Sequence, residues 1–399
     1  MSLEQKKAYL ETIRQRYKKS PRQQKAKILD EFCSVCEYNR KYAIRMLRKK
    51  QKKKRGRPGR KSKYDSINLL KPLKDIWFAS DQACSKKLKI ILHEWLPYYE
   101  FEQGLLDDLI RDQLNSISPA TIDRLLKPVR LKHPRKGLSG TKPGRLLKNQ
   151  IPIKTDHWDV NQPGYFEADT VAHCGNSLAG NFVWSLTLTD IKSTWTENRA
   201  TWNKGSHGVR NQIEDVEKSV PFPIVGFDCD NGSEFLNYHL ERYFARRDSA
   251  VQFTRSRPYH KNDNAHVEQK NWTHVRQLFG YDRFDKPCLV DLMNDLYRNE
   301  WSLYQNHFCP TMKLIEKKKI NSRYYKWYDT PKTPYHRLME SEYIPQDVKE
   351  RLEKQHATLN PFELKRAIER KLKRIFKFVT VTSKNLFKIS NNHVTWSAY

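Results

Sequence analysis

Residues 221–235 read PFPIVGFDCDNGSEF, an apolar run that ends in acids and a turn. The apolar half is typical of a buried strand, and the Asn-Gly pair is a common turn signal. In α/β sheets, functional carboxylates collect where strands end, because side chains there leave the core and face a crevice. Asp228 and Asp230 both qualify, since on an extended segment they point the same way. We favour Asp230, because the turn follows it directly.

Outward from this stretch, residues 160–280 alternate between strand-like and helix-like patterns. Runs rich in aromatic and β-branched residues predict strands, and amphipathic runs predict helices. The expected order is three strands, a helix, a strand, a helix, a strand and a helix, which makes a mixed α/β domain. Asp190, after the second strand, is expected to cap a turn. The expected segments are 164–171, 181–189, 194–200, 206–219, 222–227, 235–247, 251–253 and 263–278.

Two further acids accompany Asp230. Asp169 falls near the end of the first expected strand, and Glu268 falls on the last expected helix. Clustered carboxylates repel one another, and they stay ionised together only when cations neutralise them. Hard oxygen ligands suit Mg²⁺ or Mn²⁺, and two such ions about 3.5–4 Å apart can clamp a phosphodiester. Each acid alone would also fit an ordinary turn or a solvated helix face, so the prediction depends on their combination.

Around these acids the sequence resembles the DDE superfamily, which contains retroviral-type integrases and bacterial insertion-sequence transposases. The matching motifs are DNGSEF at 230–235 and RPYHKNDNAHVEQKN at 257–271, and Asp169 falls where the family's first aspartate lies. The resemblance implies a multidomain α/β chain with an RNase H-like catalytic core, a mixed five-stranded sheet with flanking helices. It also implies that Asp169, Asp230 and Glu268 are the catalytic residues and the ligands of two Mg²⁺ or Mn²⁺ ions.

The sequence departs from the family's pattern at three points. Ala265 replaces the usual Gly, Lys261 replaces the usual Pro, and the 37 residues between Asp230 and Glu268 exceed the commonest interval. These changes bear on the sub-family more than on the chemistry, because the acids are intact. The zinc-binding N-terminal domain of retroviral integrases is not expected, since no His precedes His93.

The chain is strongly basic: 75 Lys and Arg against 45 Asp and Glu give a formal net charge of +30. Such a surface favours a polyanion, and nucleic acid is the commonest one, because each neutralised phosphate releases a counterion. An anionic membrane is the alternative. No stretch approaches the roughly 20 apolar residues of a membrane span, and the start lacks the apolar core of a signal peptide. We expect double-stranded DNA as partner, no membrane, no small-molecule cofactor, and a cytoplasmic, nucleoid-associated location in a bacterium.

The seven cysteines are odd in number and show no framework of spacings, so reduced thiols are expected. Cys33 and Cys36 form a C-x-x-C pair. The pair could belong to a zinc site, or it could be two small residues at the end of a helix.

The N-terminal region predicts helices. Ser20 is expected as an N-cap, Pro21 as the first helical residue, and a break at 34–39 separates two short helices, the second one basic. This outline indicates a helix-turn-helix, although any small helical hairpin would also fit it. Ser118-Pro119 is expected to begin the recognition helix of a second such unit, at 120–126.

The expected domains are a helix-turn-helix at 1–54, an AT-hook-like linker at 55–63, a second helix-turn-helix at 64–127, a linker at 128–154, the catalytic core at 155–284, and a basic helical region at 285–399 with a helix at 361–377 and a strand-like tail.

Several polar residues are expected to contact DNA. Those of the N-terminal region lie on basic helices or in the AT-hook-like run, which could also be a solvated linker. Those near Glu268 are implied by the resemblance, and ordinary surface polar residues are the alternative for them. The set is Arg45, Arg48, Arg55, Arg57, Arg60, Lys61, Arg124, His260, Lys261, Asn264 and Lys270.

The function expected from these features is that of a DNA transposase of insertion-sequence type. It would bind terminal inverted repeats, cleave one strand at each end, and join the freed 3′-hydroxyl to target DNA. A homo-oligomer is expected, because two ends must be cut and joined in concert. Two alternatives stay open: an RNase H-like structure-specific nuclease without strand transfer, and a non-catalytic DNA-binding protein derived from a transposase.

Overall fold

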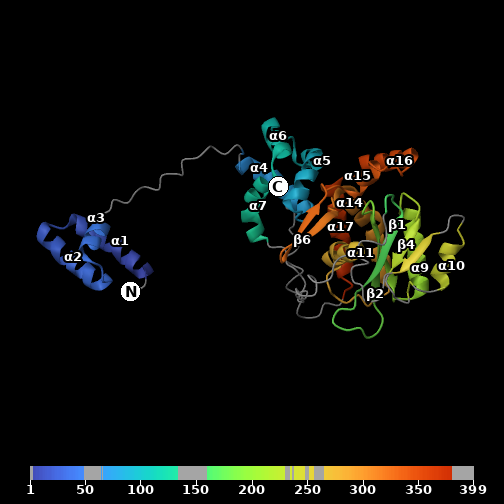
Figure 1. The fold of residues 1–399 in the computed structure, drawn as a ribbon, viewed down its shortest axis with the longest axis horizontal. Helices are drawn as coiled ribbons and strands as arrows, with labels where there is room; N and C mark the ends of the chain where they lie inside the picture. Colours follow the sequence, from blue (N-terminus) through green and yellow to red (C-terminus); the bar gives the residue numbers. More distant parts are fainter. Residues whose placement is uncertain are drawn as a thin grey trace. The chain divides into compact units, whose positions relative to one another are not determined.

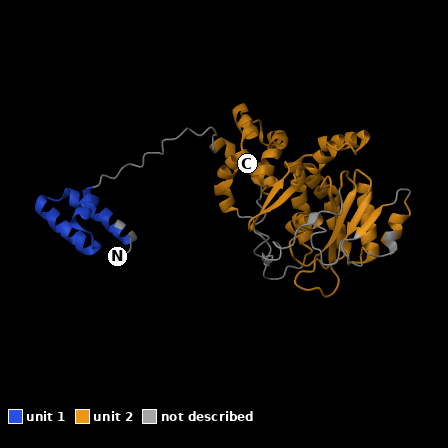
Figure 2. Cartoon of the chain, viewed as in Figure 1, with its two compact units in different colours: residues 1–63 blue, residues 64–399 orange. Residues whose placement is uncertain are grey.

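The computed structural model describes residues 3–48, 64, 66–133, 160–229, 234–235, 238–247, 251–255 and 265–379. The chain divides into two compact units, residues 1–63 and residues 64–399 (Figures 1 and 2). The AT-hook-like run 55–63, most of the linker expected at 128–154, and the tail after residue 379 lie outside the described residues.

The first unit consists of three helices, α1 (Leu3–Lys19), α2 (Arg22–Cys36) and α3 (Arg40–Arg48). Their buried apolar side chains pack into one small core around Phe32, which is fully buried. The N-cap of α2 is Pro21 rather than the expected Ser20, whose hydroxyl instead donates to the Arg16 carbonyl at 2.7 Å, in the last turn of α1. The N-terminal region is therefore helical, as the sequence predicts.

The second unit contains a five-stranded sheet in the order β3-β2-β1-β4-β5. Strands β1, β2 and β3 pair antiparallel, whereas β4 and β5 run parallel to β1. The chain crosses between β3, β4, β5 and the C-terminal region through helices α9, α10 and α11 (Figure 1). This confirms the mixed five-stranded sheet with flanking helices. The bounds are β1 (Tyr165–Ala172), β2 (Val183–Asp190), β3 (Thr196–Trp202), α9 (Ser206–Ser219), β4 (Gly226–Cys229), α10 (Tyr238–Ala245), β5 (Gln252–Arg255) and α11 (Ala265–Lys270).

Strand β4 begins later than the sequence predicts. The pattern predicts a strand at 222–227, but pairing with β1 begins only at Gly226. Pro221 and Pro223 cannot donate the ladder hydrogen bonds that a strand between two others requires. Gly164, just before β1, instead accepts hydrogen bonds from Val225 and Gly226.

Further helices precede and follow this sheet along the sequence. Before it come α4 (Ser66–Ala79), α5 (Ser85–Gln103), α6 (Asp108–Ser116) and α7 (Pro119–Lys132). After α11 the chain continues through the π-helix η1 (Asn271–Arg276), α12 (Gln277–Phe279), α13 (Cys288–Leu296), the π-helix η2 (Tyr297–Trp301) and α14 (Ser302–Phe308). The last elements are the hairpin β6 (Leu314–Ile320) and β7 (Arg323–Tyr328), then α15 (Pro334–Met339), α16 (Gln346–Ala357) and α17 (Pro361–Phe376).

Side-chain amides close the edge of β3 that no other strand pairs with. Asn294 of α13 accepts from the Ala200 N–H at 2.7 Å and donates to the Ala200 carbonyl at 2.9 Å. Asn306 of α14 makes the same pair of bonds with Thr196, at 2.9 and 3.0 Å. The two asparagines therefore satisfy backbone groups that a further strand would otherwise pair with.

The helices before the sheet share one hydrophobic core with those after it. Trp95 of α5 is the clearest link, because its ring lies 6.2 Å from that of Phe308 and 5.4 Å from that of Phe362 on α17. Arg366 of α17 makes two hydrogen bonds to Glu102, at 2.7 and 2.8 Å. Residues 66–132 and 361–376 thus contribute to one hydrophobic core. Across the described part of the chain, no helix is long and apolar enough to cross a membrane.

Candidate active site

Asp169 lies in the second half of β1, between two neighbouring strands. It pairs with Thr187 of β2, and the preceding residue, Ala168, pairs with Cys229 at the end of β4. The Asp169 side chain is half-buried, and its Oδ1 accepts from the Thr170 N–H at 2.7 Å. Asp230 follows Cys229 in the sequence and lies outside the described residues, as do His260, Lys261 and Asn264.

The helix that carries Glu268 packs against the strand that carries Asp169. Asn271, the first residue of η1, donates from Nδ2 to Asp169 Oδ2 at 2.6 Å. Glu268 precedes Asn271 by three residues on the same continuous helix and is exposed. Residues three apart on a helix lie on one face. Two of the three expected acids therefore belong to elements that meet at one place.

A third carboxylate, Glu167, fixes the beginning of α11. It is 3% exposed, and its Oε2 accepts from the Val267 N–H at 3.0 Å. A carboxylate at this position satisfies a free N–H of the first helical turn and interacts favourably with the helix dipole. Sequence reasoning missed Glu167, although its place two residues before Asp169 on one strand put both side chains on the same side of the sheet.

Glu234, four residues after Asp230 in the sequence, has its carboxylate fixed by two partners. It is 2% exposed, its Oε1 lies 2.5 Å from Lys204 Nζ, and it accepts from the Thr170 hydroxyl at 3.3 Å. Thr170 is the neighbour of Asp169, so this contact ties Glu234 to β1 beside Asp169. Glu234 belongs to the DNGSEF motif, but nothing in the sequence indicated its partners.

Asp228 and Asp190 have structural partners. Asp228 is 7% exposed and accepts from the Thr254 hydroxyl of β5 at 2.6 Å. Asp190 accepts at Oδ2 from the Ser193 N–H at 2.6 Å, and thus caps the turn between β2 and β3, as expected.

Lys270 points into the protein. It is 7% exposed, and its ammonium donates to the Thr194 carbonyl at 3.3 Å. Burial lowers the pKa of Lys270 to about 7. Burial also lowers the pKa of His274, one turn further along. The buried position leaves Lys270 no path to a phosphate, so the expected DNA contact is corrected to a contact that holds α11 on the β2–β3 turn.

The residues at this place fit a hard cation in their chemistry. Asp169 and Glu268 supply carboxylate oxygens, the ligands that Mg²⁺ and Mn²⁺ prefer. The Asn271 Oδ1 is buried and has no hydrogen-bond partner among the described residues, which leaves an amide oxygen beside Asp169 to accept from bound water. The described residues hold no group of three or more His, Cys, Asp and Glu that could bind a metal, and Asp230 is not among them.

The transition from α11 to η1 falls at this same place. A π-helical segment begins at Asn271, directly after the turn that carries Glu268. Such wide turns are rare and are found frequently at functional sites. Here the change of helix type coincides with the residue that contacts Asp169.

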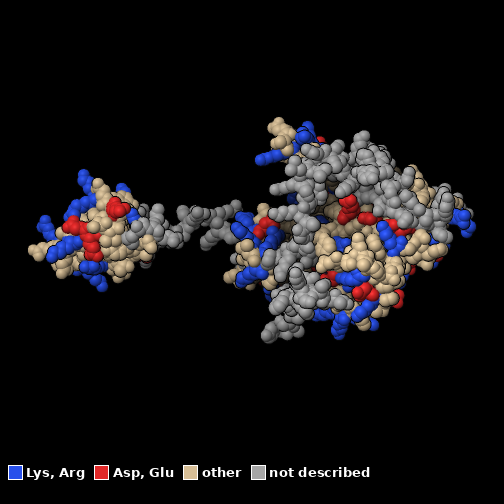
Figure 3. Space-filling view, turned by 90° about the horizontal axis from the view of Figure 1, so that it is seen from below, with Lys and Arg blue, Asp and Glu red and all other residues tan. Residues whose placement is uncertain are grey.

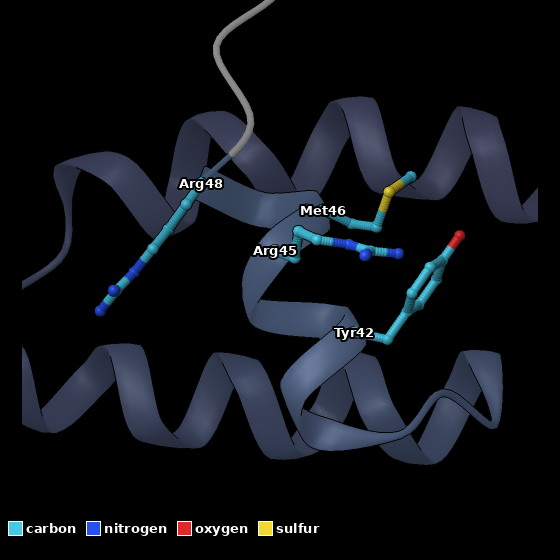
Figure 4. A pocket seen from close by; sticks show the side chains of 4 residues that line it. All are labelled: Tyr42, Arg45, Met46 and Arg48. Atoms are coloured by element: carbon cyan, nitrogen blue, oxygen red, sulfur yellow. The ribbon is translucent and has the colours of Figure 1, made fainter.

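Basic side chains expected to contact DNA lie on both units. In the first unit, Tyr42, Arg45, Met46 and Arg48 of α3 line a shallow hollow (Figure 4). The Arg45 guanidinium lies 5.1 Å from the centre of the Tyr42 ring, and both arginines are exposed. In the second unit Arg124 of α7 is exposed and donates to the Thr121 hydroxyl at 2.9 Å. In the view of Figure 3, Lys and Arg side chains are scattered among acidic and other residues on both units. Arg55, Arg57, Arg60 and Lys61 lie outside the described residues.

Comparison with known proteins identifies one relative of nearly full length. No family model matches the chain. The chain is 38% identical over 333 residues to uncharacterized protein y4rM of Sinorhizobium fredii (strain NBRC 101917 / NGR234). The alignment covers 82% of this chain and 92% of that protein. The chain belongs to the y4rM family. Identity at this level over most of both sequences means that members of the y4rM family share this fold.

Two solved structures show weaker likenesses to this y4rM-family chain. The catalytic core domain of BIV integrase is 13% identical, with a TM-score of 0.27, and the alignment covers 43% of this chain and 91% of that one. The HTLV-2 integrase catalytic core domain in complex with magnesium is 14% identical, also with a TM-score of 0.27, and covers 37% and 90%.

Proposed function

We propose that this protein is a DDE-type DNA transposase whose catalytic core is RNase H-like. The observation that carries the proposal is the hydrogen bond between Asn271 and Asp169, because it joins the helix of Glu268 to the strand of Asp169. The sheet supports it as well. Three antiparallel strands followed by two strands parallel to the first, in the order β3-β2-β1-β4-β5, is the arrangement that an RNase H-like core requires.

Asp169, Asp230 and Glu268 would hold two ions of Mg²⁺ or Mn²⁺. When bound, the ions would supply charge stabilisation to the attacking and leaving oxygens of a phosphodiester. The remaining residues position this set. Asn271 orients the Asp169 carboxylate, Glu167 fixes the first turn of α11, and Glu234 holds the segment after Asp230 against β1.

The proposed reaction has two steps at one site. Water first attacks a phosphodiester at each transposon end, and the bond that breaks leaves a free 3′-hydroxyl. That hydroxyl then attacks a target phosphodiester, forms the new strand junction and releases a target 3′-hydroxyl. Each step exchanges one P–O bond for another, so neither needs ATP.

DNA binding is proposed for basic surfaces on both units. A helix-turn-helix formed by α2 and α3 would present Arg45 and Arg48, and a second one formed by α6 and α7 would present Arg124. The second pair has a sharp turn, since Ser118 accepts from the Thr121 N–H at 3.2 Å and begins α7 two residues after α6 ends. The remaining proposed contacts are Arg55, Arg57, Arg60, Lys61, His260, Lys261 and Asn264.

The proposed assembly is a homo-oligomer on DNA in the bacterial cytoplasm. Two transposon ends have to be cut and joined in concert, and each requires its own set of three acids. The net charge of +30 disfavours association of free protomers, so the DNA would supply the neutralising charge on which they assemble.

The test is a cleavage and joining assay with the full chain. Labelled DNA from the borders of the element that encodes it is incubated with a supercoiled plasmid in Mg²⁺, in Mn²⁺ and in a chelator. We expect cleaved ends and joined products that depend on the metal. Asp169→Asn, Asp230→Asn and Glu268→Gln should each abolish both products and keep DNA binding, whereas Asp347→Asn on exposed α16 should behave as wild type.

Three outcomes would overturn the proposal. Joining at full rate by any of the three acid variants would remove the assigned catalytic residues. Metal-dependent cleavage without joining would instead assign a structure-specific nuclease. Binding of the ends without cleavage in either metal would leave a non-catalytic DNA-binding protein.

A further inference from the structure

The hairpin of β6 and β7, residues 314–328, projects from the second unit without a hydrophobic core of its own. None of its residues belongs to the buried clusters, and Ile315, Tyr325 and Trp327 are 68%, 47% and 44% exposed. An isolated two-stranded hairpin is marginally stable. Packing within the hairpin therefore does not account for the large apolar side chains that it exposes to solvent. We call residues 314–328 the arm (β6 in Figure 1).

The strand register divides the arm into two faces. Lys317 pairs with Lys326, and Lys319 pairs with Tyr324, so these four side chains share one face. We call it the lysine face. On the other face, Glu316 pairs with Trp327 and Lys318 with Tyr325, and the rings of Tyr325 and Trp327 stack 6.3 Å apart. We call this second face, with Tyr325 and Trp327, the aromatic face. Glu316, the acidic residue of the arm, thus lies on the aromatic face and not on the lysine face.

The lysine face concentrates positive charge. The ammonium groups of Lys317 and Lys319 lie 4.6 and 5.8 Å from the centre of the Tyr324 ring. Lys317 and Lys326 are like charges directly opposite each other, an arrangement that destabilises a bare hairpin. Burial and then the Lys326 charge lower the pKa of Lys317. An anion on this face would relieve the repulsion.

The base of the arm is fixed near the candidate active site. The Thr311 hydroxyl lies 2.8 Å from that of Thr194, and Lys313 Nζ donates to the Lys192 carbonyl at 3.0 Å. Thr194 also accepts from Lys270, two residues from Glu268 on α11. The β2–β3 turn therefore connects the base of the arm to the helix of Glu268.

We propose that the arm binds duplex DNA through the phosphates that meet Lys317, Lys319 and Lys326. The inference rests on the proposed function, in which DNA is the substrate, and it assigns a binding surface separate from the helix-turn-helix pairs and the three acids. A two-stranded ribbon is narrow enough to enter the major groove of B-DNA. Three ammonium groups without an acid among them match the polyanionic backbone of DNA.

The test measures how salt weakens binding of the full chain to a duplex of arbitrary sequence. The plot of log K against log salt concentration has a negative slope, and each phosphate contact contributes about −0.9 to it. Removing three contacts should therefore make the slope shallower by about 2.7. The triple variant Lys317→Gln, Lys319→Gln, Lys326→Gln should show this decrease. The control Lys218→Gln, Lys354→Gln, Lys373→Gln removes the same net charge from exposed sites on helices, and its slope should change by less than half as much.

Two further measurements distinguish DNA binding by the lysine face from misfolding and from membrane binding. Tyr325→Ser, on the aromatic face, should leave the slope unchanged, and circular dichroism should show that the triple variant keeps its fold. Equal slopes for the triple variant and wild type would overturn the proposal. So would selective loss of binding to phosphatidylserine vesicles with an unchanged DNA slope, which would assign a membrane surface. The slope needs no cleavage, so the arm can succeed or fail independently of the proposed transposase activity.

Discussion

Asn271 donates its amide proton to Asp169 at 2.6 Å across 102 residues of sequence. Both carboxylate oxygens of Asp169 accept hydrogen bonds, since Oδ1 also receives the Thr170 N–H. Donors at both oxygens restrict the rotation of the carboxylate. The contact therefore holds the Asp169 carboxylate in a fixed orientation, as the proposed metal site would require.

Removal of this hydrogen bond should slow catalysis without weakening DNA binding. Asn271→Ala leaves Asp169 free to rotate, and loss of a residue that orients a metal ligand typically lowers activity by about 10–100-fold. Asn271→Asp should be worse, because a second carboxylate would repel Asp169. The readouts are the single-turnover cleavage rate and the Kd for end DNA. Asn299→Ala, at an exposed position of η2, is the control, and an unchanged cleavage rate in Asn271→Ala would contradict the prediction.

Glu234 should affect catalysis through the segment that follows Asp230. Glu234→Gln removes the ion pair with Lys204 while it keeps the size of the side chain. We expect a cleavage rate lower by about 10-fold or more, because Glu234 loses the ion pair that fixes it four residues from Asp230. Thr170→Val removes the second anchor and should act in the same direction. Glu214→Gln, whose ion pair with Lys218 is on the surface of α9, should cleave as wild type does.

Asn306 should be important for stability. Asn306→Leu leaves a buried N–H and a buried carbonyl of Thr196 without partners, and each such loss costs about 1–3 kcal/mol. The free energy of unfolding should fall by about 2–6 kcal/mol. All ten tryptophans lie after residue 63, so tryptophan fluorescence in urea follows the second unit alone. The control is Asn299→Leu, which loses one exposed bond to Asp295; equal midpoints for the two variants would refute the role of Asn306.

Acid should destabilise the second unit partly through His173. Burial lowers the folded-state pKa of His173 to about 3, from about 6.5 in the unfolded chain. The unfolded state therefore binds the proton first, so stability present above pH 6.5 is lost as the pH falls towards 3. Between pH 7 and pH 5 this amounts to about 2 kcal/mol.

His173→Gln should lose about 2 kcal/mol less than wild type over that interval, as measured by urea unfolding at both pH values. The glutamine amide can keep a hydrogen bond to Ser185, which lies 2.7 Å from the His173 ring nitrogen. His93→Gln, at an exposed site of α5, should show the wild-type pH dependence. A wild-type pH dependence in His173→Gln would mean that the buried imidazole is not the titrating group.

Local patterns were enough to predict most of the sheet and its helices. The helix 206–219 begins and ends as the sequence predicts, and α17 begins at Pro361 because the Asn360 side chain accepts from the Phe362 N–H. The hairpin 314–328 was not predicted. Its run of three lysines hides the alternation of a strand, and it has no buried face to produce an apolar period. The π-helix at Asn271 has no known sequence signal.

The partners of the candidate site could be predicted only in part. The three acids were recognisable by motif, but Glu167, Glu234 and Asn271 acquire their contacts from residues 64 to 102 positions away. Lys270 looked like an exposed base beside Glu268, and only the packing of α11 on the β2–β3 turn revealed its burial. In the same way, no local pattern indicated that Trp95 and Phe362 share a core.

The shared interior of α4–α7 and α17 has a consequence for synthesis of the chain. Glu102 leaves the ribosome 264 residues before its partner Arg366. At roughly 5–20 residues per second, that interval lasts roughly 10–50 s. During this time the apolar faces of the early helices have no native cover and stay open to chaperones or to neighbouring nascent chains. Truncated translation products that stop before α17 should consequently be poorly soluble, even when they contain the whole sheet.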